Sequence, residues 1–214
     1  MILRTGSPWR DTPERYGPHT TCYNRFVRWR KAGVWERLLE AISAAYDGDI
    51  VMIDKSCVRV HQHGASVKKG DQDDGCMGRS RGGLTTKIHA VIDAEGRPIR
   101  LELAAGQAHD SPIATDLLDD LREGAILLAD RAYDTNALRT FAAERKAWAN
   151  IPPKANRAEN FAFSKWLYRQ RNAVERFFNK LKQFRDIATR YDKNPDNFLA
   201  AVKLAAIRLW IKSL

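Results

Sequence analysis

The stretch LTTKIHAVIDAEGRPIRLELAAG, residues 84–106, decides the fold class. Its two halves are extended and rich in β-branched residues, which favour strands. Between them, EGRP at residues 95–98 predicts a hairpin turn, because Gly and Pro interrupt the strand pattern there. A similar extended stretch, IVMIDKSCVRVHQH, precedes the hairpin at residues 50–63. The sequence therefore predicts three strands that begin a sheet.

Helical and strand patterns alternate after this hairpin. Helices are predicted at residues 111–123, 135–147, around 168–182 and at 197–214, with short strands at 124–130 and 148–153. Three joined strands followed by alternating helix and strand predict an α/β fold, in which a mixed sheet is flanked by helices. The polar, Gly-rich residues 64–83 are expected to form a loop.

The N-terminal segment has a different pattern. Residues 6–21 are rich in Pro and Gly and predict a loop, and two helical patterns follow, separated by Gly33. This arrangement permits a helix-turn-helix, although many helix pairs look the same. Arg25, Arg28 and Arg30 on the first helix are the candidate DNA contacts of this segment.

The charge of the chain is unevenly distributed. The net charge is +10 over 214 residues. Residues 1–37 carry 8 basic and 3 acidic side chains, and residues 151–214 carry 14 and 5, whereas residues 38–150 carry 14 and 18. Two basic flanks around an acidic centre suit a polyanion held around a carboxylate site, and a basic but ordinary enzyme is the alternative.

The cysteines and the hydropathy pattern exclude several protein classes. The three cysteines include no C-x-x-C pair, which argues against a disulfide framework or a zinc ribbon and fits a reducing cytosol. No apolar run reaches the roughly 18–20 residues of a membrane span, and the N-terminal residues do not resemble a secretory signal.

Two aspartates lie on predicted apolar strands. Asp54 falls inside VMIDKS and Asp130 ends ILLAD. Unpaired charge inside a strand is costly to bury, and sites in open α/β sheets gather beyond the carboxyl ends of strands. The alternative for Asp130 is a turn or helix cap, but Asp134 is the better predicted cap for the next helix.

The basic stretch YRQRNAVERFFNKLK, residues 168–182, places four functional side chains along one helix face. With 100° per residue, Tyr168, Arg171, Glu175 and Lys182 share a face about 21 Å long. An apolar stripe beside this face would pack on the sheet. Considered alone, Glu175 is explained as well by an ion pair with Arg171 at i−4.

His61 and His63 lie at strand spacing two and would face the same side. Without a third nitrogen or sulfur ligand in the pattern, a structural role or a DNA contact is favoured over a zinc site.

Together these stretches resemble the DDE transposases of bacterial insertion sequences. VMIDKS, LLADRAYD and YRQRNAVERFFNKLK are similar to the three catalytic blocks of that family, and the last has its Tyr, Arg, Glu and Lys spacing. GRSRGGLTTKIHAVIDAEGRPI, GQAHDS, FRDIATRYDK and RTGSPWRDTPERYGP are also similar, so the resemblance covers nearly the whole chain.

The resemblance implies a ribonuclease H-like DDE catalytic domain at residues 48–214. It implies an N-terminal helical segment at residues 1–47, part of a DNA-end-binding region. Asp54, Asp130 and Glu175 are expected to be catalytic and to bind two Mg²⁺ ions, for which Mn²⁺ substitutes. The expected reaction is DNA cleavage at insertion-sequence ends, followed by strand transfer into target DNA.

Further expectations concern the partners. Tyr168, Arg171 and Lys182 are expected to contact DNA beside the scissile phosphate. The resemblance also implies a homodimer that holds two element ends. The expected location is the nucleoid of the bacterial cytoplasm, with no membrane association.

Two departures from the family leave an alternative open. Lys55 stands where the family usually has a small hydroxyl residue after the first aspartate, so its ammonium would perturb ion binding or contact DNA. Family members also usually carry helical sequence upstream of the point where this chain begins. The alternatives are therefore a truncated, catalytically impaired DNA-binding remnant or regulator of transposition, and a nuclease that cuts without joining.

Overall fold

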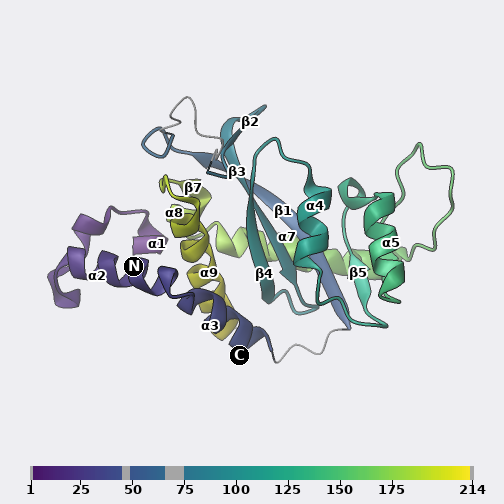
Figure 1. Ribbon diagram of the computed structural model, residues 1–214, viewed down its shortest axis with the longest axis horizontal. Helices are drawn as coiled ribbons and strands as arrows, with labels where there is room; N and C mark the ends of the chain where they lie inside the picture. The colour runs from purple at the N-terminus through teal and green to yellow at the C-terminus, as the bar shows by residue number, and fades with distance from the viewer. Residues whose placement is uncertain (1, 45–48, 66–74, 213–214) are drawn as a thin grey trace.

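The computed structural model describes residues 2–44, 49–65 and 75–212 and is built on one mixed sheet (Figure 1). Its centre is an antiparallel meander of β1 (Ile50–Val60), β3 (Gly83–Ile92) and β4 (Pro98–Ala105). The predicted turn connects β3 to β4, where Gly96 has a φ of 83° that glycine adopts without strain. The three predicted strands are confirmed.

The other half of the sheet is parallel to β1. β5 (Ile126–Leu128) pairs with β1, and β6 (Trp148–Asn150) pairs with β5. The resulting order β4–β3–β1–β5–β6, antiparallel on one side of β1 and parallel on the other, is the expected ribonuclease H-like arrangement.

Two short strands extend this sheet, and neither was predicted. β2 (Gly78–Ser80) pairs with β3, and β7 (Thr189–Arg190) pairs with β1. β2 lies inside the expected loop of residues 64–83, of which residues 66–74 are outside the described part of the chain. Both strands are short and polar, GRS and TR, and so lack the apolar run that identified the similarly short β5.

Successive side chains of β1 point to opposite faces of the sheet and pack into a separate hydrophobic core on each face. Met52 and Val58 pack under α7 (Asn172–Leu181) and α9 (Pro195–Ile211). Val51 and Ile53 point to the opposite face, covered by α4 (Asp110–Leu117) and α5 (Asn136–Glu144). Burial on both faces explains why β1 reads as an almost continuous apolar run before Asp54.

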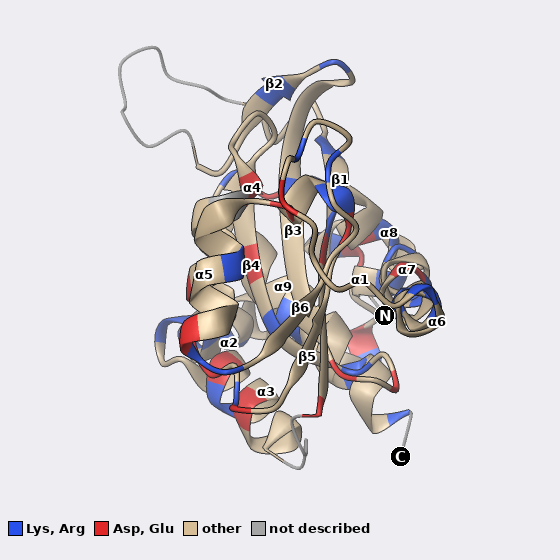
Figure 2. Cartoon of the chain, turned by 90° about the vertical axis from the view of Figure 1, so that its right-hand side faces the viewer, with Lys and Arg blue, Asp and Glu red and all other residues tan. Residues whose placement is uncertain are grey.

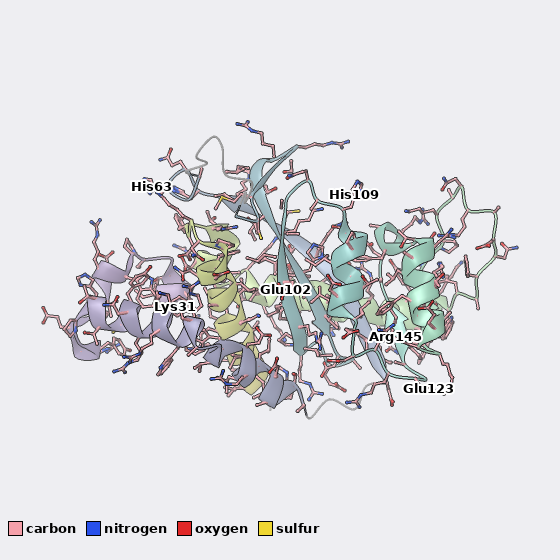
Figure 3. The ribbon with its side chains drawn as sticks, in the orientation of Figure 1. Lys31, His63, Glu102, His109, Glu123 and Arg145 are labelled. Carbon is pink, nitrogen blue, oxygen red and sulfur yellow. The ribbon has the colours of Figure 1, made fainter. Side chains whose placement is uncertain are left out.

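The N-terminal helices lie at one end of the molecule, where the first packs on α8 (Arg185–Ala188) and the other two pack on α9. They are α1 (Ile2–Thr5), α2 (His19–Lys31) and α3 (Val34–Ser43), with two 3-10 turns, η1 (Trp9–Asp11) and η2 (Glu14–Tyr16), in the predicted loop. Gly33, with a φ of 66°, separates α2 from α3 as expected. Lys31 marks this end in Figure 3, far from Arg145 of α5. Phe26, Trp35 and Leu39 belong to the same hydrophobic core as α9. The predicted domain boundary at residue 47 therefore stays a prediction.

The long basic helix predicted at residues 168–182 is interrupted. It consists of α6 (Lys165–Tyr168), a 3-10 turn η4 (Arg169–Arg171) and α7, and the short α8 (Arg185–Ala188) follows. The first helix after the meander is also shorter than predicted, since α4 ends at Leu117. Among the described residues, no helix is long and apolar enough to span a membrane.

Candidate active site

Asp54 and Asp130 lie next to each other on neighbouring strands. In the parallel pair of β1 and β5, Met52 is opposite Leu128, so each aspartate lies two residues beyond a paired position. Neighbouring strands are about 4.8 Å apart. The side chain of Asp54 is 14% exposed, and Asp130 is half-buried. The sheet thus gathers two carboxylates that are remote in sequence.

Asp130 is also a cap. Its Oδ1 accepts a hydrogen bond of 2.8 Å from the N–H of Ala132 in the 3-10 turn η3 (Arg131–Tyr133). The prediction that Asp134 caps the next helix was wrong, since Thr135 accepts from the N–H of Leu138 in α5. A carboxylate has lone pairs to spare after one such bond, so the cap leaves Asp130 able to bind a cation.

Arg171 connects Glu175 to Asp54. Its guanidinium lies 2.6 Å from Asp54 Oδ2 and 2.7 Å from Glu175 Oε1. The predicted i−4 ion pair of Glu175 therefore exists, and the same arginine extends it to β1. Glu175 is 55% exposed, whereas Asp54 and Arg171 are each 14% exposed. The third carboxylate lies at the open rim of the site.

The electrostatics of Asp54 reflect this crowding. Burial raises the pKa of Asp54, and the neighbouring charge of Asp130 adds to the rise. The N–H of Lys55, 2.8 Å from Asp54 Oδ1, and the guanidinium of Arg171 offset part of it. Burial and the charges of Asp54 and Asp130 also raise the pKa of the Tyr133 hydroxyl.

The three acids suit a divalent cation by donor chemistry, since carboxylate oxygens are the ligands that Mg²⁺ and Mn²⁺ prefer. Their present arrangement is held by Arg171. Within the described ranges, no three His, Cys, Asp or Glu side chains form a group that could hold a metal ion. Arg171 must give up its contacts with Asp54 and Glu175 before both acids can share a cation.

Comparison with known families agrees with this geometry. The model described as "Transposase DDE domain" matches residues 45–210. The chain belongs to this family of DDE transposase domains. A second model, "Putative transposase of IS4/5 family", matches residues 1–39.

Individual relatives of the transposase domain are similar over shorter stretches. A Brucella ovis protein, "Putative transposase for insertion sequence element IS6501", is 40% identical over 130 residues, which is 60% of this chain and 100% of that protein. The "Insertion element IS402 uncharacterized 16.2 kDa protein" of Burkholderia cepacia is 44% identical over 46 residues, covering 21% and 31%. The solved Mos1 transposase paired-end complex with left transposon end covers 99% of this chain and 74% of that chain, at 14% identity and a TM-score of 0.33. At that score the structural likeness decides nothing.

The basic face of the transposase domain includes the 3-10 turn η4. Tyr168 lies before the turn, with its ring 5.4 Å from that of Phe163 and 5.6 Å from the Arg171 guanidinium. Lys182 lies at the end of α7, where its Nζ donates to the Cys57 carbonyl of β1 at 3.2 Å. Figure 2 shows Lys and Arg positions along α6 and α7 and at the tip of the β2–β3 hairpin. Arg171 pairs with Glu175, and both Arg171 and Lys182 contact β1, so the shared face of the four side chains stays a prediction.

The three N-terminal arginines are in different surroundings. Arg25 and Arg28 are exposed on α2. Arg30 is 15% exposed and forms an ion pair of 2.7 Å with Asp196 at the start of α9. Arg25 and Arg28 are therefore the better placed of the three to meet a polyanion.

His61 and His63 form an aromatic group rather than a metal site. Their rings lie 4.7 Å apart, and the ring of Tyr191 lies 4.7 Å from His61. His63 lies beside β7 at the end of β1 (Figure 3). The preference for a structural role or a DNA contact over zinc stays a prediction.

Lys55 points away from the carboxylates. It follows Asp54 in β1 and therefore faces the opposite side of the sheet, where its ammonium forms an ion pair with Asp110. Lys87 lies 2.9 Å from the same carboxylate. The stretch GQAHDS resembles the family, but its pattern predicts no role for Asp110. The partners of Asp110, Lys55 and Lys87, are distant in sequence and meet it only in the fold.

One cleft of the described residues lies away from the carboxylates. It has a volume of about 720 Å³ between α3, β4 and α4, and Glu36, Glu102 and Asp116 are among its lining residues. None of the predicted site residues lines it. The carboxylates lie outside this cleft, and of the three Glu175 is the most exposed, at 55%.

Proposed function

We propose that this DDE transposase domain cleaves DNA at insertion-sequence ends and transfers the strand into target DNA. The observation that carries the proposal is the convergence of Asp54, Asp130 and Glu175. Asp54 on β1 and Asp130 just beyond β5 follow paired positions of adjacent strands, and Arg171 links Glu175 to Asp54. Family membership over residues 45–210 supports the same chemistry.

Asp54, Asp130 and Glu175 would hold two Mg²⁺ ions, with Mn²⁺ as a substitute. Bound there, divalent ions supply an activated attacking oxygen and neutralise the charge of the phosphoryl group and leaving oxygen. Asp54 is linked to Glu175 through Arg171 and is affected by the charge of Asp130, so it would be the ligand shared by both ions, with its Oδ1 fixed by the N–H of Lys55. Asp130 is fixed by the N–H of Ala132.

Arg171, Lys182 and Tyr168 would bind the DNA strand beside the scissile phosphate. The guanidinium of Arg171 already pairs with the carboxylates of Asp54 and Glu175. It can exchange one of these carboxylates for a phosphate oxygen of DNA. Lys182 presents an ammonium at the same end of β1, where a phosphate can replace the Cys57 carbonyl. Arg25 and Arg28 would bind DNA from residues 1–47, leaving residues 48–214 as the catalytic domain.

The active complex would be a homodimer that brings two element ends together, and it would act on the bacterial nucleoid in the cytoplasm. These assignments follow from the family, and the exposed basic helix α2 and the basic surface of α7 support a DNA partner.

The test is cleavage and joining of an oligonucleotide that carries the element end, with Mg²⁺. The wild type should nick the end and join it to target DNA, whereas Asp54→Asn should bind the same DNA but lose cleavage by at least about a thousandfold. Glu123→Gln is the matched control, because Glu123 is an exposed acid that pairs with Lys146 away from the site (Figure 3).

Each other outcome rejects part of the proposal. Cleavage that persists in Asp54→Asn would refute the site. Cleavage without joining by the wild type would indicate a nuclease. DNA binding without cleavage by the wild type would indicate a regulator or remnant of transposition.

A further inference from the structure

A buried polar group lies behind the carboxylates, on the face of the sheet that α4 covers. We call it the Asp110 cluster, and it consists of Asp110, Lys55, Lys87 and His89. The Asp110 carboxylate accepts from Lys55 through one oxygen and from Lys87, at 2.9 Å, through the other. His89 Nε2 lies 3.8 Å from the same oxygen as Lys87.

The cluster is largely removed from water. Exposed fractions are 22% for Lys55, 10% for Lys87, 13% for Asp110 and 0% for His89. Asp110 is the first residue of α4, directly after His109, which marks the upper end of this helix in Figure 3. One helix terminus thus places a single carboxylate between two lysines on adjacent strands.

The charges of the cluster do not cancel. Each lysine contributes a cation and Asp110 one anion. Burial, together with Lys55 and Lys87, lowers the pKa of His89 to about 4, so its ring is neutral at pH 7. The cluster therefore carries one net positive charge in a low-dielectric position, where charges act over longer distances than in water.

This charge lies next to the proposed cation site. Lys55 is the residue after Asp54, and its own N–H donates to Asp54 Oδ1. Its ammonium is 5.7 Å from the ring of Tyr133, whose hydroxyl lies 3.4 Å from His89 Nδ1. Tyr133 in turn is close enough to Asp54 and Asp130 for their charges to affect it. Only the thickness of the sheet separates the Asp110 cluster from the carboxylates.

We propose that Asp110 is a positioning residue that sets the divalent-cation affinity of the carboxylate site, by holding the Lys55 ammonium behind the sheet and neutralising it. This inference rests on the proposed function, since it requires that Asp54, Asp130 and Glu175 bind a cation. It also explains how the domain accommodates a lysine directly after its first catalytic aspartate: the cation is turned away and given a counter-ion.

The test compares Mn²⁺ binding by the full-length chain without DNA, with free Mn²⁺ measured by electron paramagnetic resonance. Four proteins form a cycle in which the net charge of the Asp110 cluster is the variable. The charge is +1 in the wild type, +2 in Asp110→Asn, 0 in Lys55→Ser and again +1 in the double variant.

Asp110→Asn should weaken Mn²⁺ binding about tenfold, and Lys55→Ser should strengthen it about tenfold, which is the size of effect that outer-shell partners have on bound metals. The double variant should return to within about threefold of the wild type. Lys146→Ser and Asp119→Asn are matched controls that remove one charge each from exposed ion pairs before β6 and β5, and they should leave Mn²⁺ affinity unchanged.

The alternatives give different results. A purely structural Asp110 would lower the thermal midpoint of Asp110→Asn but leave the Mn²⁺ affinity of all four proteins equal, which would overturn the inference. If Asp110→Asn does not fold, Lys55→Ser decides alone, because unchanged or weaker binding there contradicts the proposal. Absence of Mn²⁺ binding by the wild type would overturn the proposed function and this inference with it, whereas binding without the charge dependence would overturn the inference only.

Discussion

Replacing Asp134 by Asn should remove a buried ion-pair network that stabilises the fold near the site. The Asp134 carboxylate is fully buried and accepts from Arg139 Nε at 2.7 Å, Arg157 Nε at 2.9 Å and the N–H of Lys154 at 2.7 Å. Arg139 and Arg157 are only 7% and 13% exposed, so solvent screens these pairs little. The carboxylate thereby fastens the segment after Asp130 to residues 151–157.

The magnitude follows from leaving two buried guanidinium groups without their shared anion. Removing one partner of a buried ion pair costs about 3–5 kcal/mol. For a chain of this length, each kcal/mol lowers the thermal midpoint by roughly 2–4 °C. Asp134→Asn should therefore lose about 4 kcal/mol of unfolding free energy, which corresponds to a midpoint lower by roughly 8–16 °C.

Urea unfolding followed by circular dichroism measures this difference, and pH provides a second check. Burial alone would raise the pKa of Asp134, but the hydrogen bonds from Lys154, Arg157 and Arg139 outweigh it and lower the pKa. The contribution is therefore complete above the unfolded value of about 3.9 and is lost as pH falls through the folded value below it. The stabilities of the wild type and Asp134→Asn should begin to converge as pH falls below about 4, and should become equal only below the folded pKa of Asp134.

Asp119→Asn serves as the control, because Asp119 is 70% exposed in its pair with Arg145, and its midpoint should equal that of the wild type. A loss of under about 1 kcal/mol in Asp134→Asn, or a loss that persists undiminished below pH 4, would refute the reasoning.

Three other perturbations test separate parts of the molecule. Because the pKa of His89 is lowered from 6.5 to about 4, the unfolded chain takes up a proton that the folded chain refuses, and unfolding free energy should fall by about 3 kcal/mol between pH 6.5 and 4; urea titrations of His89→Asn should lack that fall. Arg190 is fully buried and donates to Thr86 Oγ1 at 2.7 Å, so Arg190→Met should lower the unfolding free energy by about 3 kcal/mol. Thermal unfolding measures this loss, and an unchanged midpoint would contradict it. Joint replacement of Arg25 and Arg28 by Gln should reduce the slope of log affinity for DNA against log salt by about 2, in filter binding, while an unchanged slope would remove α2 from the DNA surface.

The parts of the fold that were predictable are those whose information is local. The β-branched runs and the EGRP turn identify β1, β3 and β4, because a strand of eight or more residues repeats its pattern several times. The ion pair between Arg171 and Glu175 was predictable for the same reason, since i and i+4 meet on any helix.

The remaining features depend on contacts between distant segments. Arg171 reaches Asp54 across 117 residues, and Asp110 meets Lys55 and Lys87 only after α4 docks on the sheet. Asp134 looked like a helix cap because its neighbours in sequence permit it, but burial gave it three stronger donors. Nothing in the pattern of a single segment encodes such partners.

The 3-10 turn η4 has a mechanical consequence. Arg171 is its last residue, and α7 begins immediately afterwards, anchored by the buried Ala173, Val174, Phe177, Phe178 and Leu181. The hydrogen bonds of a 3-10 turn have poorer geometry than those of an α-helix, so such a turn is a weaker segment between two α-helices. Arg171 therefore lies at the junction between η4 and α7. A change in helical winding by one residue there would move its guanidinium away from Asp54, whereas Glu175 would stay in place on the anchored α7.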